Sequence, residues 1–315
     1  MDALSLVFKT IHLETTSCHR VELSAPWGLR VGSYYGAVFF VVTRGSCWLE
    51  AESLETPLPL AGGDLVVLPR GQRHALRDDL KSPDVECQDW LVASDAAMQV
   101  FHLGGSGRPT TLVYGRFHLE EPTLNPLLKA LPPLILVKGE EGQAVEWLNT
   151  TIQFIAGEMA AKRPGAHTVI SHLTEILFIQ AVRAYIVNKE YCGTCWLRAL
   201  TDPQIGVALT LIHRYAEKPW TVATLADQVG MSRSAFATEF RELVGEPPLQ
   251  YLTRWRMHKA AGLLRQGQGN LAELAAQVGY ESEAAFSNAF KRWMGKAPGI
   301  YRRALRTEVS TSDAP

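Results

Sequence analysis

The chain has 315 residues, of which 47% are hydrophobic and 20% charged, and its formal net charge is −1, a composition that predicts two ordinary domains with apolar cores. No apolar run approaches the roughly 18 residues of a membrane span, and the first residues lack the pattern of an export signal, so we expect a cytoplasmic protein with no membrane partner. The five cysteines are odd in number and too few for a disulfide scaffold.

The two ends of the chain differ in charge. Residues 201–306 carry 14 Lys and Arg against 9 Asp and Glu, a net charge of +5, whereas residues 1–200 carry 17 against 21, a net charge of −4. A basic module joined to an acidic one suits a protein that places one half on DNA. A net charge of +5 is also common on proteins that never bind nucleic acid.

Short apolar runs broken by turn residues extend from Arg20 to about Phe117. Strands are predicted at residues 36–43, 47–51, 65–68 and 74–77, with a turn at 69–72. Several short strands at this spacing indicate a small barrel or sandwich, which we place in residues 1–120.

Residues 121–190 have helical periodicity. Apolar side chains recur at three- and four-residue steps over 145–159 and again over 170–184, with Pro164 and Gly165 between. The two amphipathic helices either cap the barrel or pair with their copies in a second subunit.

A linker is predicted at residues 191–202, where Asp202 and Pro203 form the N-cap and first residue of the next helix. The linker contains Cys192 and Cys195. They are a redox pair, half of a zinc site that lacks two further ligands, or two incidental thiols.

Between Trp220 and Tyr301 the chain contains an internal repeat of about 50 residues. Residues 221–231 align with 270–280, and the pair Phe236 and Phe240 aligns with Phe286 and Phe290. Each copy pairs apolar residues at i, i+4, then has a glycine at a turn and a capped second helix, which predicts two helix-turn-helix units. The N-cap is Ser232 in the first copy and Glu281 or Ser282 in the second. A helix over 249–264 joins the units.

The repeat resembles the signature of the AraC/XylS family of bacterial transcription regulators. The segments that carry the resemblance are Pro219-Trp-Thr-Val222, Val229-Gly-Met-Ser-Arg-Ser-Ala-Phe236, Val278 to Phe286 and Phe290 to Tyr301. The family implies two helix-turn-helix units, held by one helix, that enter successive major grooves on one face of double-stranded DNA. It also implies RNA polymerase as a partner and a homodimer.

The N-terminal segment resembles the cupin-type sensor domain of one branch of these regulators. The shared order is a strand, Gly63-Asp64, an apolar strand and Pro69-x-Gly-x-x-His74. Cupin enzymes hold a metal through several His and a Glu, and here only His74 stands in the expected stretch, so we expect no metal, no cofactor and no enzymatic activity. His74 is either a barrel-mouth histidine bonded to backbone or a contact to a small-molecule effector.

The sensor branch includes oxidant-responsive regulators, which raises a second possibility for the signal. Cys18 lies beside His19, which lowers a thiol pKa when protonated, and Cys87 lies between Glu86 and Asp89, which raise it. A Cys18–Cys87 switch requires that the two Cα atoms come within about 7 Å.

The helical period predicts which side chains face DNA. With the paired phenylalanines turned inward, the outward set provides short polar base contacts, Asn288 suits adenine and Glu283 suits cytosine. Arginines and lysines at the margins suit phosphates. The predicted DNA-binding residues are Arg233, Ser234, Ala237, Thr238, Arg241, Glu283, Ala284, Asn288, Lys291 and Arg292. The alternative for any one of them is a solvated helix face.

We therefore predict an α+β multidomain regulator: a cupin-like β-barrel with a helical extension, then an all-α domain of two helix-turn-helix units over residues 203–306 and a disordered tail over 307–315. A cupin metalloenzyme with a helical appendage would instead hold a stoichiometric metal. A DNA-binding protein without a ligand would have a barrel filled with side chains and little preference for sequence.

Overall fold

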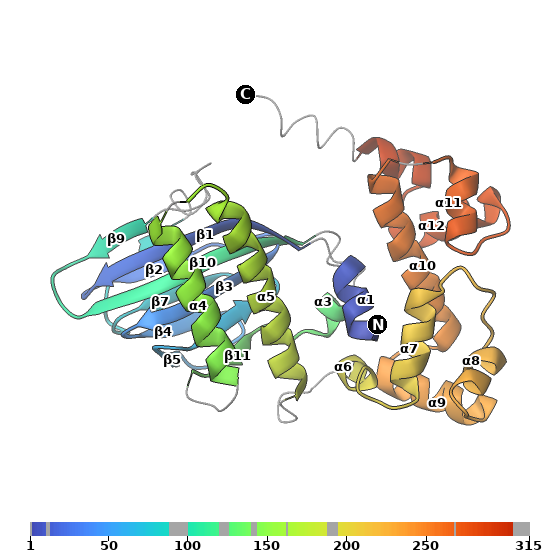
Figure 1. Ribbon diagram of the computed structural model, residues 1–315, viewed down its shortest axis with the longest axis horizontal. Helices are drawn as coiled ribbons and strands as arrows, with labels where there is room; N and C mark the ends of the chain where they lie inside the picture. Colours follow the sequence, from blue (N-terminus) through green and yellow to red (C-terminus); the bar gives the residue numbers. More distant parts are fainter. Residues whose placement is uncertain are drawn as a thin grey trace. The chain divides into compact units, whose positions relative to one another are not determined.

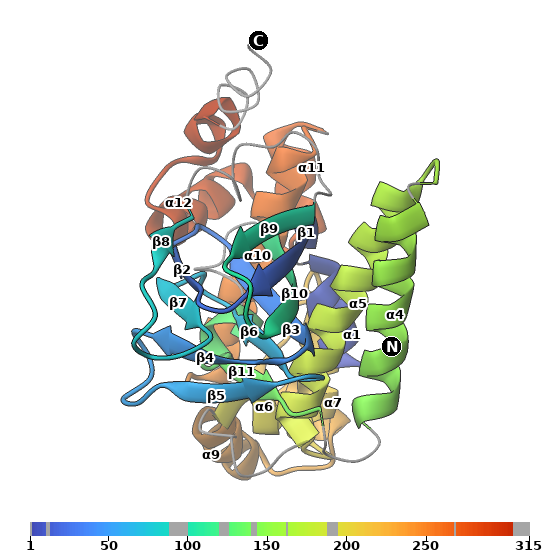
Figure 2. The same ribbon diagram turned by 90° about the vertical axis from the view of Figure 1, so that its left-hand side faces the viewer.

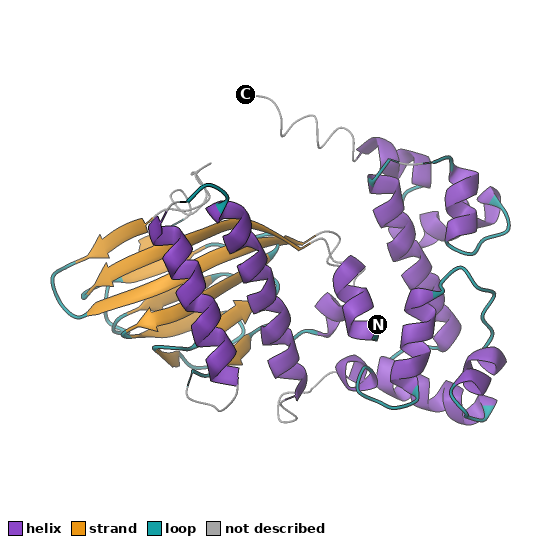
Figure 3. Cartoon of the chain, viewed as in Figure 1, coloured by secondary structure: helices purple, strands orange, loops and turns teal. Residues whose placement is uncertain are grey.

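The computed structural model describes residues 2–10, 13–87, 100–119, 126–139, 144–161, 163–187, 195–267 and 269–304. They form two compact units (Figures 1 and 3). One unit contains residues 12–122 and 131–193 and holds the strands. The other contains residues 1–11, 123–130 and 194–315 and is helical.

Strands and helices are largely segregated along the chain, with most strands before most helices. The strands are β1 (Leu13–Ser24), β2 (Gly28–Val31), β3 (Ala37–Arg44), β4 (Ser46–Ala51), β5 (Leu58–Ala61), β6 (Leu65–Leu68), β7 (His74–Arg77), β8 (Val85–Glu86), β9 (Val100–Gly104), β10 (Pro109–Leu119) and β11 (Ile135–Val137). The helices are α1 (Ala3–Thr10), α3 (Pro126–Ala130), α4 (Ala144–Ala161), α5 (Ala166–Val187), α6 (Cys195–Ala199), α7 (Ile205–Arg214), α8 (Val222–Gln228), α9 (Arg233–Val244), α10 (Pro248–Arg265), α11 (Leu271–Gln277) and α12 (Glu283–Met294).

The strands form two sheets that face each other. The first has the order β11-β6-β3-β10-β1-β9 and the second β5-β4-β7-β2-β8. Alternate residues of both sheets point between them, and Val21, Phe40, Leu49, Leu76 and Tyr114 are among the buried residues of that core. The predicted cupin-type β-structure is confirmed, with strands 65–68 and 74–77 at their predicted limits.

The longest strands, β1 and β10, were not predicted individually. β1 pairs along its length with β10, from Leu13 opposite Leu119 to Ser24 opposite Pro109, with a bulge between Thr15 and Ser17. The sequence of β1 is LETTSCHRVELS, in which polar residues outnumber apolar ones. A strand of this composition is stable because its ladder lies inside the sheet, which only the tertiary pairing reveals.

Helices α4 and α5 cover the outer face of the first sheet, side by side (Figure 2). Phe117 of β10 stacks on Phe39 of β3 and meets Phe178 of α5 edge-on, with ring centroids 5.0 and 5.5 Å apart. By length and composition α5 is apolar enough to cross a membrane, and in this structure it packs against β1, β6 and β11.

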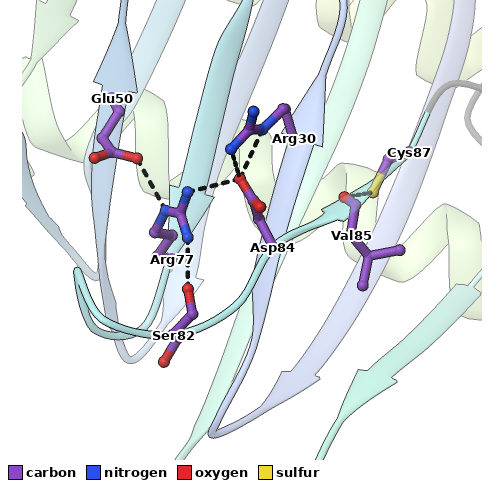
Figure 4. Close-up of polar contacts among 7 residues, drawn as sticks. All are labelled: Arg30, Glu50, Arg77, Ser82, Asp84, Val85 and Cys87. Atoms are coloured by element: carbon purple, nitrogen blue, oxygen red, sulfur yellow. Dashed lines mark hydrogen bonds and ion pairs between the residues drawn. The ribbon is translucent and has the colours of Figure 1, made fainter.

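An arginine network fixes the loop between β7 and β8 to the second sheet (Figure 4). Arg77 donates to Glu50 at 2.9 Å, to the Ser82 carbonyl at 2.5 Å and to Asp84 at 2.6 Å. Arg30 binds the same Asp84 oxygen. These contacts lower the pKa of the Asp84 carboxyl although desolvation acts to raise it. The network positions β8, which ends beside Cys87.

Two short segments from the N-terminal half of the chain belong to the helical unit. Helix α1 packs on α7, and its Ala3 and Val7 are buried. Helix α3 packs on α6, with Leu127 and Leu128 buried. Neither contact was predicted, because a sequence pattern shows that a face is apolar but not which distant helix covers it.

Candidate nucleic-acid interface

The first helix-turn-helix consists of α8 and α9. The Thr221 hydroxyl accepts the Thr224 N–H at 3.1 Å, and the Thr224 hydroxyl accepts the Thr221 N–H at 2.9 Å, which completes a capping box at the start of α8. Gly230 turns the chain with φ of 70°. Ser232 then caps α9 by accepting the Ala235 N–H at 3.3 Å, as predicted.

The second helix-turn-helix, α11 and α12, repeats this construction. Asn270 and Glu273 form the capping box. Gly279 turns the chain with φ of 81°. Of the two predicted caps for α12, the structure has Ser282, whose hydroxyl accepts the Ala285 N–H at 3.2 Å. Both second helices end in a left-handed glycine, Gly245 and Gly295.

The phenylalanine pairs anchor both second helices. Phe236, Phe240, Phe286 and Phe290 are completely buried. Within each pair the ring centroids are 5.5 and 5.6 Å apart. Each fully buried ring contributes about 1.5–3 kcal/mol of transfer free energy, so the buried stripe fixes the rotation of α9 and α12 about their axes. The opposite faces must then point to solvent.

Helix α10 joins the two helix-turn-helix units, which lie at its opposite ends (Figure 1). It begins at Pro248, and its Leu252, Trp255, Ala260 and Leu264 are buried, while Leu263 is partly buried. Its 18 residues span about 27 Å at a rise of 1.5 Å per residue.

A buried polar cluster holds α7 to α10. His213 lies 2.7 Å from the Tyr251 hydroxyl and stacks on Trp255 at a centroid distance of 3.9 Å. Trp196 of α6 donates to the same hydroxyl at 3.3 Å. Burial lowers the pKa of His213 to about 3, so the imidazole is neutral at physiological pH.

Helix α7 begins at Ile205, slightly later than predicted. Asp202 still performs the capping role, because its carboxylate accepts the N–H groups of Gln204 and Ile205 at 2.9 and 2.7 Å. Of the linker thiols, Cys192 and the side chain of Cys195 both lie outside the part of the chain that the structure describes.

The predicted DNA-facing residues have the same exposure in both copies. From Ser232 to Arg241 and from Ser282 to Lys291 the succession of exposed, half-buried and buried positions is identical. Ala237 is half-buried. The exposed members are Arg233, Ser234, Thr238, Arg241, Glu283, Ala284, Asn288, Lys291 and Arg292. The structure therefore leaves both outward faces free of intramolecular packing.

His74 lies inside the sheet sandwich. It is 2% exposed, its Nδ1 lies 2.9 Å from the Gln72 carbonyl and its Nε2 lies 3.3 Å from the Tyr114 hydroxyl. Burial lowers its pKa to about 4. A neutral ring donates from Nδ1 to the carbonyl and accepts from Tyr114 at Nε2, which is the backbone-bonded arrangement. Among the described residues no three His, Cys, Asp or Glu side chains gather as metal ligands.

The thiols of Cys18 and Cys87 lie on opposite sides of the first sheet. Cys18 is opposite Gly115, on the same face as Phe117 and the helices, whereas Cys87 belongs to the core between the sheets. Burial raises the pKa of the Cys18 thiol to about 12, and His19, whose own pKa burial lowers to about 4, is neutral and cannot lower it. The expectation that His19 activates Cys18 is therefore wrong.

The sequence analysis did not single out two buried polar residues of the N-terminal, strand-bearing unit, Ser17 and Arg116. Both point into the core between the sheets, and the alternation Leu112, Tyr114, Arg116 along β10 was the available signal. Only the bulge in β1 brings Ser17 opposite Arg116.

Comparison with known proteins agrees with this architecture. A cupin family model matches residues 2–187 and a helix-turn-helix domain model matches residues 225–304. The HTH-type transcriptional regulator AlkR of Acinetobacter baylyi is 36% identical over 96% of this chain and 99% of its own length. A putative AraC-like transcription regulator of Streptomyces lividans is 35% identical over 96% and 97%.

Among solved structures, the DNA-binding domain of AdpA in complex with a target DNA is 34% identical and covers 34% of this chain and 96% of its own, with a TM-score of 0.32. Both of the full-length relatives described above are named as transcription regulators. With its cupin N-terminal domain, its duplicated helix-turn-helix and these full-length relatives, the chain belongs to the AraC-type family of HTH transcriptional regulators.

Proposed function

We propose that this regulator recognises a specific DNA sequence by placing α9 and α12 in two successive major grooves on one face of the duplex, under the control of a small molecule bound by its N-terminal unit. The observation that supports it most is the identical exposure of the two second helices, whose buried faces are fixed and whose outward faces are free.

The dimensions of α10 suit this mode of binding. The helix spans about 27 Å, and successive major grooves on one face of DNA lie about 34 Å apart. The two helix-turn-helix units project from the ends of α10, so the distance that they must add to reach both grooves is small. Arg233, Arg241, Lys291 and Arg292 flank the outward faces and would contact phosphates, while Thr238 and Asn288 would contact bases.

Base contacts and phosphate contacts are separable by experiment. Footprinting upstream of the protein's own and neighbouring genes supplies the operator, and fluorescence anisotropy then compares it with a random duplex. Asn288→Ala should cost about 1–3 kcal/mol on the operator and little on the random duplex. Lys291→Ala should weaken both equally and reduce the salt slope by about 1. The exposed Lys81→Ala of the N-terminal unit is the control and should change neither affinity.

The fixed spacing of the two helix-turn-helix units gives the decisive test. Five base pairs inserted between the two protected segments rotate one segment by about half a turn, because a full turn takes about 10.5 base pairs. If the two helix-turn-helix units are rigidly joined, the affinity for the operator should then fall to that of a single helix-turn-helix unit. Retention of full affinity on the inserted operator would refute the two-groove proposal.

We also propose a homodimer formed through α5. Besides its sheet-facing side, α5 has a second stripe at alternating steps of four and three residues, in which Val169, Leu173, Ile176 and Val187 are apolar and Gln180 and Arg183 are polar. Val169, Ile176 and Val187 are exposed and Leu173 is partly buried. This spacing is that of a coiled-coil seam. Ile176→Glu should convert the dimer to a monomer in sedimentation equilibrium, whereas His172→Glu, at an exposed position outside the stripe, should not.

The signal is proposed to be a small molecule rather than an oxidant. The Cys18 thiol is buried and its pKa is raised, so it should react slowly with oxidants, and Cys18 and Cys87 lie on opposite sides of the first sheet. Cys18→Ala should therefore leave the regulatory response unchanged. We propose that the bound regulator acts through RNA polymerase, which in vitro transcription from the footprinted promoter, with and without the protein, would test.

A further inference from the structure

The N-terminal unit contains a buried positive charge for which its described residues supply no counter-ion. The Arg116 side chain of β10 points between the two sheets, and the residue is 8% exposed. Its Nε is fully covered and has no hydrogen-bond acceptor. Its guanidinium has a single ring contact, Tyr34, with Cζ 5.0 Å from the ring centroid. In the described part of the chain no carboxylate pairs with it.

A second unsatisfied group lies directly across the ladder. Ser17 of β1 is the register partner of Arg116, so the two side chains emerge on the same face from Cα atoms about 5 Å apart. The residue is 9% exposed and its hydroxyl has no partner. The Nε of Arg116 and the hydroxyl of Ser17 are buried donors for which the described residues supply no acceptor, an arrangement that costs stability unless an acceptor is supplied.

The surroundings select the charge and the size of that acceptor. The neighbouring imidazoles of His19 and His74 are neutral, because burial and then the charge of Arg116 lower both pKa values to about 4. One guanidinium therefore balances one negative charge. A dianion such as phosphate would leave an unbalanced charge among the buried aromatic rings of Phe40 and Tyr114.

The loop that holds Tyr34 over the guanidinium is tightly constrained. The Tyr34 N–H donates to the Gly71 carbonyl at 2.7 Å, and the Tyr34 hydroxyl lies 3.2 Å from the Thr16 hydroxyl. A Cβ on Gly71 would lie 2.3 Å from the Tyr34 carbonyl oxygen, so only glycine permits this approach. The ring is thus held in place before any ligand arrives.

We infer that Arg116 and Ser17 form the anchor of a ligand site for a small organic monocarboxylate, with the guanidinium and the hydroxyl donating to its two oxygens and its apolar part lying toward the aromatic core. A planar guanidinium matches a carboxylate through two parallel hydrogen bonds. The inference deepens the proposed sensor role, because it assigns the chemical class of the signal and the residues that bind it.

Thermal unfolding of the full chain tests the site with sodium benzoate and sodium hexanoate as probes, benzamide and hexanamide as neutral analogues, and inorganic phosphate and sulfate as other anions. At least one carboxylate should raise the Tm, and its amide and the inorganic anions should not. Arg116→Met should abolish this rise, and without ligand its Tm should equal or exceed that of the wild type, because it removes an uncompensated buried charge.

Two further variants separate binding from folding. Ser17→Ala leaves the charge in place and should weaken carboxylate binding roughly 10- to 150-fold in isothermal titration calorimetry. Arg20→Gln removes a partly exposed arginine from the other face of β1 and should bind as the wild type does. The inference is overturned if neither carboxylate raises the wild-type Tm, if an amide or an inorganic anion raises it equally, or if Arg116→Met or Ser17→Ala binds as tightly as the wild type.

The same titrations distinguish this inference from the proposed function. If a carboxylate binds through Arg116 but leaves operator affinity unchanged, the site stands and the sensor role fails. If the operator is bound specifically and neither carboxylate binds, the carboxylate site fails and the DNA-binding proposal stands.

Discussion

The duplication supplies its own control for a prediction about stability. Gly230 and Gly279 occupy the same turn in the two copies, and their φ angles of 70° and 81° are both in the left-handed region. A Cβ on Gly230 would have no neighbour within 4 Å, whereas a Cβ on Gly279 would lie 2.7 Å from the Glu217 carbonyl oxygen and 2.7 Å from an Arg256 nitrogen. The two alanine variants therefore share one cost and differ in another.

The shared cost is the left-handed conformation, about 1–2 kcal/mol for a residue with a Cβ. Gly279→Ala adds the displacement of a backbone carbonyl, about 1–3 kcal/mol by analogy with overpacked cores. Arg256 holds that region, because its guanidinium donates to the carbonyls of Ala216 and Lys218 at 2.7 and 2.8 Å and would have to move as well. We expect Gly230→Ala to destabilise by about 1–2 kcal/mol and Gly279→Ala by about 2–5 kcal/mol.

Differential scanning calorimetry of the full chain measures both variants on the transition of the helical unit, with about 4 °C of Tm per kcal/mol. The N-terminal transition is the internal reference and should not move. Equal losses in the two variants, or a larger loss for Gly230→Ala, would refute the argument that close approach at Gly279 matters.

Two further predictions concern the helical unit. Ser232→Ala and Ser282→Ala each remove an N-cap acceptor and should each destabilise by about 1 kcal/mol in urea titrations, while Ser234→Ala, which caps no helix, should leave the midpoint unchanged. The pKa of His213 is about 3 in the folded state against an ordinary value of 6.5, because burial disfavours the charged imidazole. Its stabilising effect is therefore complete above pH 6.5 and is lost as the pH falls toward 3. Unfolding at pH 5 should be about 2 kcal/mol easier than at pH 7 from this group, and His213→Gln should remove that part of the pH dependence.

Most of the DNA-binding half was predictable from sequence because its determinants are local. Phenylalanines at i, i+4, a turn glycine and a capping serine each act within one or two helical turns, and the repeat presents each signal twice. These signals gave the inward faces correctly, and the outward faces of α9 and α12 follow from them as the complement. The first residue of α7 is Ile205 rather than the predicted Pro203, a difference of the one or two residues by which helix ends are commonly uncertain.

The N-terminal unit was predictable only in class. Turn residues and short apolar runs indicate strands, but the order of the two sheets and the pairing of β1 with β10 depend on contacts between residues about 100 positions apart. Strand alternation assigns side chains to faces only when the bulge is known, and the bulge near Ser17 is not visible as a pattern.

The sequence by itself therefore determined the family and the two helix-turn-helix units, and it predicted which faces of α9 and α12 are exposed, because each depends on neighbours in the chain. Only the tertiary structure decided that Cys18 and Cys87 lie on opposite sides of the first sheet, that α1 and α3 pack with the helical unit, and that Arg116 is buried beside Ser17 with no counter-ion among the described residues. Burial and pairing are properties of the whole fold, and the electrostatic character of a residue is set by what surrounds it rather than by its place in the chain.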